Sequence, residues 1–358
     1  MKIRHGKWFL LLFIVCFFWS CNDDEPIREI PKGQDGFFVV NEGAFGNSNA
    51  SLSFFDRENG VMNNNIFNAT NGFDLGDQAQ SMTLFDTLAF VVVQNSGKIE
   101  VMHRQTFESL ATIDDDITSP RYLTVVDNEK AYISDWVDGF SGVLHVLDIP
   151  SFEITSTINI GAGPNEITLD GNTAYVALNG GFGNDNRIAV LNTTTDAITG
   201  YLETRDNPNV VVLVNNKLWI AGRGKTAYNP DFSIDEANSA KSYLARLDKD
   251  GTEELYLEAP DFTLSNVGNF VYNELDNEFY FTYNGAVYRF DTGIDAFPST
   301  AFINQSFYGL GYDPIEDALI GLETPDFSSS GNLIYFDDNG NSTKTFTVGI
   351  GPNSIVLD

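Results

Sequence analysis

The chain has 358 residues, of which 50 are acidic and 20 are basic, giving a formal net charge of −30. A surface this anionic repels nucleic acid and argues against a polybasic membrane-binding patch. Its 14 Tyr, 29 Phe and 31 Gly are instead typical of packed strands joined by tight turns.

The first 20 residues are predicted to be a secretory signal rather than part of the fold. Lys2, Arg4 and Lys7 form a basic start, and residues 8–19 are an uninterrupted apolar run that is too short to span a bilayer. A small residue and Cys21 follow this run, a layout that resembles a bacterial lipoprotein signal with lipid attached to Cys21. The alternative is a chance cysteine at the end of an ordinary signal peptide.

Residues 21–35 are predicted to be a lipidated tether. The acidic run at 22–25 resembles the surface-export signal of Bacteroidetes lipoproteins, which implies an outer-membrane protein facing the cell exterior, although plain tethers also carry such runs. Cys16 leaves with the signal, so an acylated Cys21 would leave no thiol for a disulfide or a metal site. Removal of the predicted signal would take away Lys2, Arg4 and Lys7, which changes the formal net charge from −30 to −33.

Residues 36–358 are predicted to be one domain built from a repeated four-strand module. One copy is 164–169, 174–178, 187–191 and 197–202, and another is 121–126, 131–134, 143–147 and 153–160. Further copies begin near Gln80, Asn207, Leu264 and Ser306, and an insertion at 223–242 lengthens one step. Short alternating strands with turn residues at fixed offsets predict an all-β fold, a seven-bladed β-propeller.

The seventh copy is split between the two ends of this region. GPNSIVLD at 351–358 nearly repeats GPNEITLD at 163–170, but the strand that should follow is found instead as GFFVVNEG at 36–43. Pairing the two segments would close the ring and leave no exposed sheet edge.

The loops between second and third strands are long and rich in aromatic residues, which marks their side of the disc as the functional face. The aromatic side chains form either a binding platform or a small core that anchors the loops. They are Phe45, Trp136, Phe140, Phe182, Tyr228, Phe232 and Phe327. Arg223 opens the longest of these loops and is a further candidate ligand contact.

Polar residues at the starts of the innermost strands are candidate ligand contacts around the central opening. These are Gln80, Arg121, Asn165, Asn209, Asn266 and Asn353. The structural alternative is that the Asn side chains cap turns and link neighbouring blades by hydrogen bonds.

Catalytic patterns are weak, and we expect a protein that is not an enzyme. The sequence contains no GxSxG elbow, P-loop or HExxH motif. Carboxylates near the loop face, namely Glu42, Asp135, Asp138 and Glu323, leave a glycosidase pair open. Asp- and Asn-rich turns such as 184–186 and 337–341 suit Ca²⁺, but turn formation explains them more simply, so no metal site is predicted.

The repeats GPNEITLDGNTAYVA and SPRYLTVVDNEKAYISD resemble the YVTN-type propeller repeat. GFFVVNEG at 36–43, LGDQAQSM at 75–82 and FVVVQNSGKIEVM at 90–102 resemble, more narrowly, the BtuG-type surface lipoproteins of Bacteroidetes. Asn41, Glu42, Gly43, Gln80 and Ser81 match positions of that family. The aromatic loops match no fixed motif of it.

The resemblance implies a propeller that binds cobalamin or another corrinoid, needs no cofactor, and passes its ligand to a TonB-dependent outer-membrane transporter. It implies a monomeric propeller attached to the membrane only through its lipid. Two other classes stay open from the residues: a carbohydrate-active or glycan-binding propeller, and a cell-surface scaffold that docks protein on its aromatic face.

Overall fold

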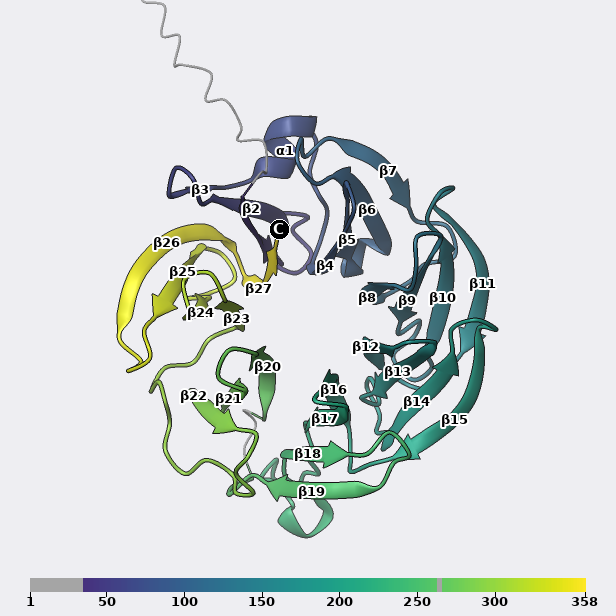
Figure 1. Ribbon diagram of the computed structural model, residues 1–358, viewed down its shortest axis with the longest axis vertical. Coiled ribbons are helices and arrows are strands. Elements are labelled where there is room, and N and C mark those ends of the chain that lie inside the picture. Colours follow the sequence, from purple (N-terminus) through teal and green to yellow (C-terminus); the bar gives the residue numbers. More distant parts are fainter. Residues whose placement is uncertain (1–34, 263–265) are drawn as a thin grey trace, which may run out of the picture. The chain divides into compact units, whose positions relative to one another are not determined.

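The computed structural model describes residues 35–262 and 266–358, in which 27 strands form seven antiparallel sheets arranged around a ring (Figure 1). The predicted all-β, seven-bladed propeller is therefore confirmed. The predicted signal peptide at 1–20, the lipidation site at Cys21 and all but the last residue of the tether at 21–35 lie outside the described residues.

Each sheet is one blade, and its first-numbered strand lies nearest the ring axis except in the closing blade, where β27 does (Figure 1). The closing blade contains β27 (Pro352–Leu357), β1 (Gly36–Asn41), β2 (Ser51–Asp56) and β3 (Val61–Asn63). The next contains β4 (Ala79–Phe85), β5 (Leu88–Val93), β6 (Lys98–His103) and β7 (Ser109–Ile113). It is followed by β8 (Pro120–Val125), β9 (Lys130–Asp135), β10 (Val143–Asp148) and β11 (Glu153–Asn159).

The remaining blades continue in chain order around the ring. They are β12 (Pro164–Asp170), β13 (Thr173–Leu178), β14 (Arg187–Asn192) and β15 (Ala197–Glu203); β16 (Pro208–Val214), β17 (Lys217–Gly222), β18 (Tyr243–Leu247) and β19 (Glu253–Glu258); β20 (Gly268–Asn273), β21 (Glu278–Tyr283) and β22 (Ala286–Asp291); and β23 (Gly309–Asp313), β24 (Ala318–Glu323), β25 (Ser330–Phe336) and β26 (Ser342–Ile350).

The two ends of the propeller meet in the closing blade, as the split repeat predicts. Strand β27 pairs antiparallel with β1, and Val39 lies opposite Ile355. The backbone N–H groups of Glu42 and Gly43 extend the junction by donating to the carbonyls of Gly351 and Ile350, at 2.8 and 2.9 Å. Without β27 the inner edge of β1 would be unpaired.

Two details differ from the four-strand pattern. In the closing blade β3 ends at Asn63, and Asn65, with a left-handed φ of 55°, precedes the short helix α1 (Ile66–Asn71), an element outside the predicted four-strand module. Helix α1 buries Ile66 and Phe67, and two adjacent apolar residues are equally compatible with a strand in the sequence. The β20–β22 sheet has three strands among the described residues, and an isolated bridge from Val287 to Ile303 lies where a fourth would begin.

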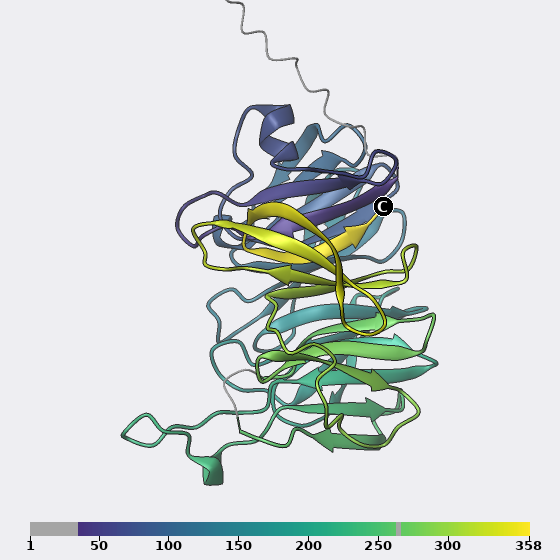
Figure 2. The same cartoon turned by 90° about the vertical axis from the view of Figure 1, so that its left-hand side faces the viewer.

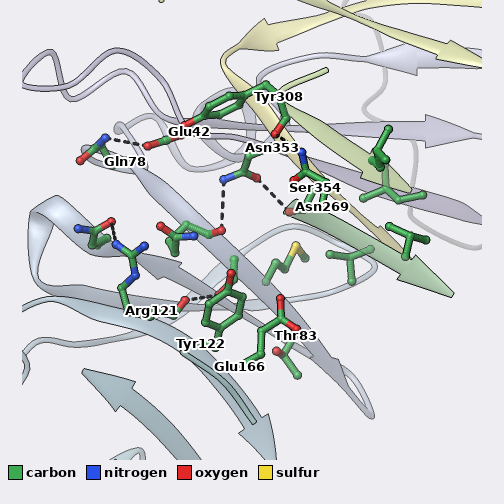
Figure 3. Close-up of a pocket in the computed structure, with 18 of the residues that line it drawn as sticks. Glu42, Gln78, Thr83, Arg121, Tyr122, Glu166, Asn269, Tyr308, Asn353 and Ser354 are labelled. Atoms are coloured by element: carbon green, nitrogen blue, oxygen red, sulfur yellow. Dashed lines mark hydrogen bonds between the residues drawn. The ribbon is translucent and has the colours of Figure 1, made fainter. Parts of the chain in front are cut away.

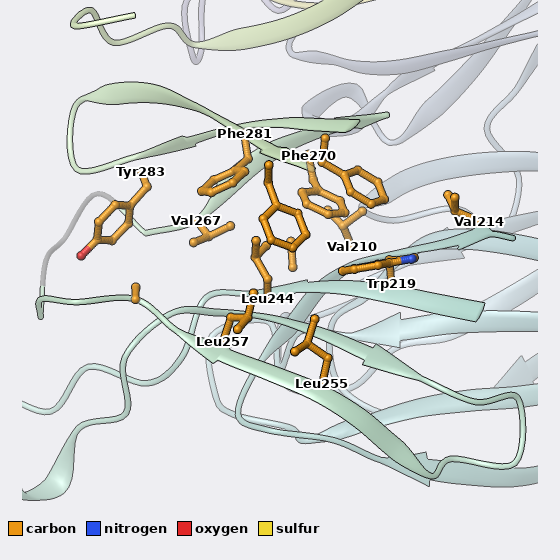
Figure 4. Close-up of a cluster of buried hydrophobic side chains, with 14 residues drawn as sticks. Val210, Val214, Trp219, Leu244, Leu255, Leu257, Val267, Phe270, Phe281 and Tyr283 are labelled. Atoms are coloured by element: carbon orange, nitrogen blue, oxygen red, sulfur yellow. The ribbon is translucent and has the colours of Figure 1, made fainter. Parts of the chain in front are cut away.

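Neighbouring blades are held together by apolar side chains that fill the space between them. Figure 4 shows one such layer, in which Trp219 and Leu244 of the β16–β19 blade pack against Phe270 and Phe281 of the β20–β22 blade. The Phe270 and Phe279 rings stack at 4.1 Å between centroids. Because each blade buries its faces against two neighbours, the ring gives the inner strands fixed positions around the axis.

The insertion at 223–242 forms an excursion with antiparallel bridges from Lys225 to Ala240 and from Tyr228 to Ile234, and includes the short 3₁₀ helix η2 (Glu236–Asn238). Figure 2 shows it, in green-teal at lower left, extending beyond the strands on one side of the disc. A second 3₁₀ turn, η1 (Gln94–Ser96), occupies the corresponding short loop after β5.

Candidate functional site

The inner strands enclose a cavity of about 660 Å³ at the centre of the ring, which we call the hub cavity (Figure 3). Polar side chains dominate its lining, and apolar ones contribute a smaller part. The lining residues are Glu42, Gln78, Gln80, Ser81, Met82, Thr83, Gln94, Arg121, Tyr122, Glu166, Asn269, Phe270, Val271, Tyr308, Leu310, Asn353, Ser354, Ile355 and Val356. A polar cavity of this size suits a ligand, or part of a ligand, that is rich in hydrogen-bonding groups.

The second residues of the seven inner strands form a ring around the axis. In chain order they are Gln80, Arg121, Asn165, Asn209, Asn269, Leu310 and Asn353. Asn269 holds the position that was predicted for Asn266, because β20 begins only at Gly268. Asn266 lies before that strand and is not among the residues that line the hub cavity.

Three of these Asn side chains link neighbouring blades, which supports the structural alternative for them. The amide of Asn165 donates to the carbonyl of Asn209 at 2.9 Å, that of Asn269 to Tyr308 at 3.1 Å, and that of Asn353 to Ala79 at 2.9 Å. Asn353 and Asn269 also line the hub cavity, whereas Asn165 and Asn209 do not. The residues predicted as candidate ligand contacts therefore include some that only link neighbouring blades and others that line the cavity.

A hydrogen-bonded carboxyl group lies on one side of the hub cavity. Glu42 accepts from the Gln78 amide at 2.7 Å and from the Tyr308 hydroxyl. Burial raises the pKa of Glu42, although these two hydrogen bonds and the charge of Arg121 act in the opposite direction. Both carboxylate oxygens are thus already engaged by neutral donors.

Arg121 lies across the cavity in a prearranged position. Its Nη1 donates to the Gln94 side-chain oxygen at 2.6 Å, and its guanidinium lies over the Trp136 ring at 4.2 Å from the centroid. Burial lowers the pKa of Arg121, and the buried Nε has no hydrogen-bond partner. Such a stacked, partly unsatisfied guanidinium is positioned to donate hydrogen bonds to an acceptor group of a ligand.

Glu166 and Tyr122 form the deeper part of the lining and were not singled out from the sequence. Burial raises the pKa of Glu166 to about 7. Burial also raises the pKa of Tyr122, and the negative charge of the nearby Glu166 raises it further. Within the described part of the chain, no basic side chain is recorded within 4 Å of Glu166. Its carboxyl group is therefore the readily titratable group of the cavity near neutral pH.

Replacing Glu166 by Gln is expected to stabilise the protein at pH 8 by about 1–2 kcal/mol. Between pH 4.5 and about 7 the native state holds a proton that the unfolded chain has lost, so the stability of the parent protein falls as pH rises through this window. Contact with cavity water reduces the effect below that of a dry site. Urea unfolding at pH 5 and pH 8 measures it.

The control for this experiment is Glu153→Gln, at an exposed position on β11. It should leave the difference in stability between pH 5 and pH 8 unchanged, whereas Glu166→Gln should reduce that difference. An equal pH dependence in the parent protein and Glu166→Gln would contradict the assignment.

Some of the predicted loop aromatics pack into groups that contact residues of the hub-cavity lining. Phe182, 73% exposed, packs edge-on against Trp136 at 6.1 Å and Phe140 at 5.9 Å, and we call these three residues the Phe182 cluster. Trp136 is only 8% exposed and its indole N–H donates to the Pro164 carbonyl at 2.9 Å, so it anchors the cluster. Trp136 also contacts Arg121, which joins the cluster to the cavity.

A second aromatic pair borders the cavity from another blade. Phe327 packs edge-on against Tyr308 at 5.1 Å, and Tyr308 lines the cavity. Phe45, Tyr228 and Phe232 are more than half exposed and do not line the hub cavity. None of the predicted aromatics lines the cavity, but Phe327 contacts the lining residue Tyr308, and the Phe182 cluster contacts the lining residue Arg121 through Trp136.

The residues that match the BtuG-type pattern divide into some that line the hub cavity and others that have a structural role. Glu42, Gln80 and Ser81 line the hub cavity. Asn41 is buried and donates to Ser53 Oγ at 3.0 Å, so it has a structural role. Gly43 has a φ of +80°, and a Cβ there would lie 2.6 Å from the Asn49 side chain, so only glycine fits.

Three of the four carboxylates considered for catalysis stabilise loops. Asp135 accepts the backbone N–H groups of Thr118, Ser119 and Val137, and Asp138 accepts those of Phe140 and Ser141. Glu323 accepts the side-chain amides of Gln305 and Asn332.

Arg223 follows β17 at the start of the insertion, and its Nη2 donates to the Asn179 carbonyl at 2.9 Å. Burial lowers its pKa. It is not part of the cavity lining, but its charge acts on Arg121.

Across residues 35–262 and 266–358, no group of three or more His, Cys, Asp or Glu side chains is arranged to hold a metal ion. The helices in the same ranges are all too short or too polar to cross a bilayer.

Comparison with known proteins supplies the family. The family model described as "Domain of unknown function (DUF5074)" matches residues 35–350. The chain belongs to this family. No curated protein sequence matches the chain.

Solved structures similar to this DUF5074 chain confirm the fold. A quinonprotein alcohol dehydrogenase-like protein from Bacteroides thetaiotaomicron has a TM-score of 0.64 and 14% sequence identity, covering 90% of this chain and 78% of its own. Hydrazine synthase from Kuenenia stuttgartiensis has a TM-score of 0.62 and 12% identity, covering 86% of this chain and 97% of its own. At these identities the likeness concerns the propeller alone.

Proposed function

We propose that this protein is a binding protein without catalytic activity that captures cobalamin or a related corrinoid on the loop face and passes it to a TonB-dependent outer-membrane transporter. The observation that carries the proposal is the polar hub cavity with two separate aromatic groups next to its lining: the Phe182 cluster, which contacts Arg121 through Trp136, and the Phe327–Tyr308 pair. A large ligand with apolar ring faces and many amides requires both kinds of surface.

The side chains around the cavity match the amide groups that surround a corrin ring. Gln78, Gln80, Gln94 and Asn353 carry groups that both donate and accept hydrogen bonds. Phe140 and Phe182 offer exposed ring surface to cover an apolar part of the ligand. The proposed function needs no cofactor, because it consists only of binding the ligand tightly and releasing it to the transporter.

The proposal includes the place of the protein in the cell. A lipid on Cys21 and the acidic run after it would hold a monomeric propeller at the outer membrane, facing the exterior, beside its transporter. The anionic propeller would touch neither nucleic acid nor the bilayer, except through the lipid.

Calorimetric titration with cyanocobalamin and cobinamide tests the proposal. The Phe140→Ala/Phe182→Ala variant is expected to bind about tenfold to 100-fold more weakly, because two aromatic contacts at about 0.5–1.5 kcal/mol each, with their buried area, are lost. Both rings are exposed, so the fold should be unaffected.

The matched control is Phe232→Ala, which removes an 87% exposed ring from the insertion, away from the cavity lining. Its affinity should equal that of the parent protein. Absence of binding to both corrinoids would contradict the proposed ligand, and equal affinity in all three proteins would place the site elsewhere.

A carbohydrate-active function is the second candidate, favoured by one observation: two carboxyl groups with raised pKa, Glu42 and Glu166, line the same cavity. A glycosidase needs one protonated and one ionised carboxyl near neutral pH. Turnover on a panel of polysaccharides, abolished in both Glu42→Gln and Glu166→Gln, would establish this class in place of simple capture.

A further inference from the structure

Two of the described arginines, one in the lining of the hub cavity and one at the start of the insertion, lack the carboxylate partner that the others have. Of the eight arginines in residues 35–262 and 266–358, six lie within 4 Å of an Asp or Glu oxygen. These six are Arg57, Arg104, Arg187, Arg205, Arg246 and Arg289. The exceptions are Arg121 and Arg223. In a chain with 50 acidic residues, two arginines without an ion pair at one place call for an explanation.

Contacts with the β12–β15 blade connect the two exceptions. Trp136, over which Arg121 lies, donates to the Pro164 carbonyl, and Arg223 donates to the carbonyl of Asn179, which follows β13. Burial is the main cause of the lowered pKa of Arg121, and the charge of Arg223 adds to it. Glu42 attracts Arg121 from a distance, but its carboxylate is hydrogen-bonded to Gln78 and Tyr308. Two half-buried cations that repel each other without a bonded counter-charge raise the energy of the protein.

Both guanidinium groups keep donors for a further partner. Arg121 donates through Nη1 to Gln94, and its Nε is buried without a hydrogen-bond partner. Arg223 uses Nη2 to bind the Asn179 carbonyl. The Trp136 ring fixes the plane of Arg121 from one side, so the remaining donors are held in place before a ligand arrives.

We propose that Arg121 and Arg223 together form a seat for an oxyanion, a phosphate ester, on the captured ligand. The inference rests on the proposed binding function and deepens it by assigning the anionic part of the ligand to this edge of the hub cavity. Arginine forks match phosphate oxygens in pairs, and a low-dielectric setting strengthens the contact. A bound phosphate would supply a counter-charge to both guanidinium groups.

Among corrinoids, the seat favours those with a nucleotide loop, whose phosphodiester cobinamide lacks. The parent protein should bind cyanocobalamin at least about tenfold more tightly than cobinamide, since a charge-assisted hydrogen bond is lost with the phosphodiester. Arg121→Gln and Arg223→Gln should each bring the ratio of the two affinities toward one, chiefly by weakening cyanocobalamin. Calorimetry measures both ligands on each variant.

A second arm uses dimethyl phosphate alone, followed by chemical-shift changes or thermal stabilisation, with acetate at equal concentration for comparison. The parent protein should bind dimethyl phosphate more tightly than acetate, and Arg223→Gln should lose this binding. Arg223→Gln leaves the Arg121–Trp136 contact in place, so it serves even if Arg121→Gln fails to fold. Arg205→Gln, which removes an exposed ion pair with Glu253, is the control and should behave as the parent.

The two arms separate failure of the inference from failure of the proposed function. If neither corrinoid binds but dimethyl phosphate binds in an Arg223-dependent manner, the seat stands and the corrinoid proposal falls. If corrinoids bind with the same affinity ratio in the parent, Arg121→Gln and Arg223→Gln, the seat is refuted and the corrinoid proposal stands. Dimethyl phosphate binding that is equal in the parent and Arg223→Gln also refutes the seat.

Discussion

Removal of residues 352–358 is expected to leave the ring open and the protein unable to fold stably. The deletion takes away β27, the inner strand of the closing blade, and exposes the edge of β1, in which Phe37, Phe38, Val39 and Val40 are fully buried. The lost ladder hydrogen bonds and buried apolar area amount to several kcal/mol, comparable with the whole stability of a typical domain. An open edge also favours aggregation.

The measurement is the oligomeric state and the urea midpoint of the truncated protein, with and without a synthetic peptide of residues 351–358. The peptide should restore a monomer and raise the midpoint, because it can pair with β1 in trans. The same peptide with proline at positions 354 and 356 cannot complete the ladder and should not rescue. A truncated protein that is monomeric and unchanged in stability would contradict the closure.

Arg57→Met is expected to destabilise the protein by about 3–5 kcal/mol, the usual effect of removing one partner of a buried ion pair. Arg57, at the end of β2, donates two hydrogen bonds to the Asp313 carboxylate, at 2.8 and 3.0 Å, and Asp313 is fully buried. The pair joins the closing blade to the β23–β26 blade. Without it, Asp313 keeps only the Tyr335 hydroxyl and two backbone N–H groups.

The stability lost in Arg57→Met should be larger at high pH than at low pH. Burial acts to raise the pKa of Asp313, but the hydrogen bonds and charge of Arg57 outweigh it and hold the native pKa below 3.8. The pair therefore stabilises the parent protein above about pH 4, and this stabilisation is lost as pH falls through the native pKa. In Arg57→Met the buried carboxyl should instead favour protonation, so the deficit should be largest near pH 8 and smaller near pH 4.

Urea unfolding of Arg57→Met, Asp313→Asn and the double variant checks this prediction. The double variant should recover part of the lost stability, because no unpaired buried charge remains. Arg205→Met removes an exposed ion pair and should change stability by no more than about 1 kcal/mol. A loss in Arg57→Met as small as in this control would contradict the assigned role of the pair.

The architecture was predictable from the sequence because its signals are local and repeated. The near-copies at 163–170 and 351–358 revealed both the module and its split, and the pairing of Val39 with Ile355 follows from them. Helix α1 was missed because Ile66 and Phe67 are apolar in either structure. The left-handed turn at Asn65 that redirects the chain has no comparable signal.

The hub lining was less predictable because the inner strands are irregular. The register shifts between Pro164 and Ile167, between Pro208 and Val210, and between Gly268 and Val271. Each β-bulge breaks the two-residue alternation on which inward and outward faces are assigned. Glu166 lies inside one such bulge, and Asn269 inside another, so their place in or near the cavity could not be counted along the strand.

The loop aromatics show a different limit. Composition identified Trp136, Phe140 and Phe182 as a set, but the sequence does not distinguish the buried Trp136 from the exposed Phe182. The difference arises between blades, where Trp136 donates to Pro164 and lies against Arg121. Such contacts join residues far apart in the chain and leave no local pattern.

The closing blade also fixes when the molecule can be completed. Strand β1 is the first described strand to be synthesised and β27 the last, so every other blade can form while β1 still lacks its neighbour. Until residues 352–357 are in place, the inner edge of β1 has no partner strand and the closing blade lacks its fourth strand. Completion of the closing blade therefore depends on the last of the described strands to be synthesised, which supplies its inner strand.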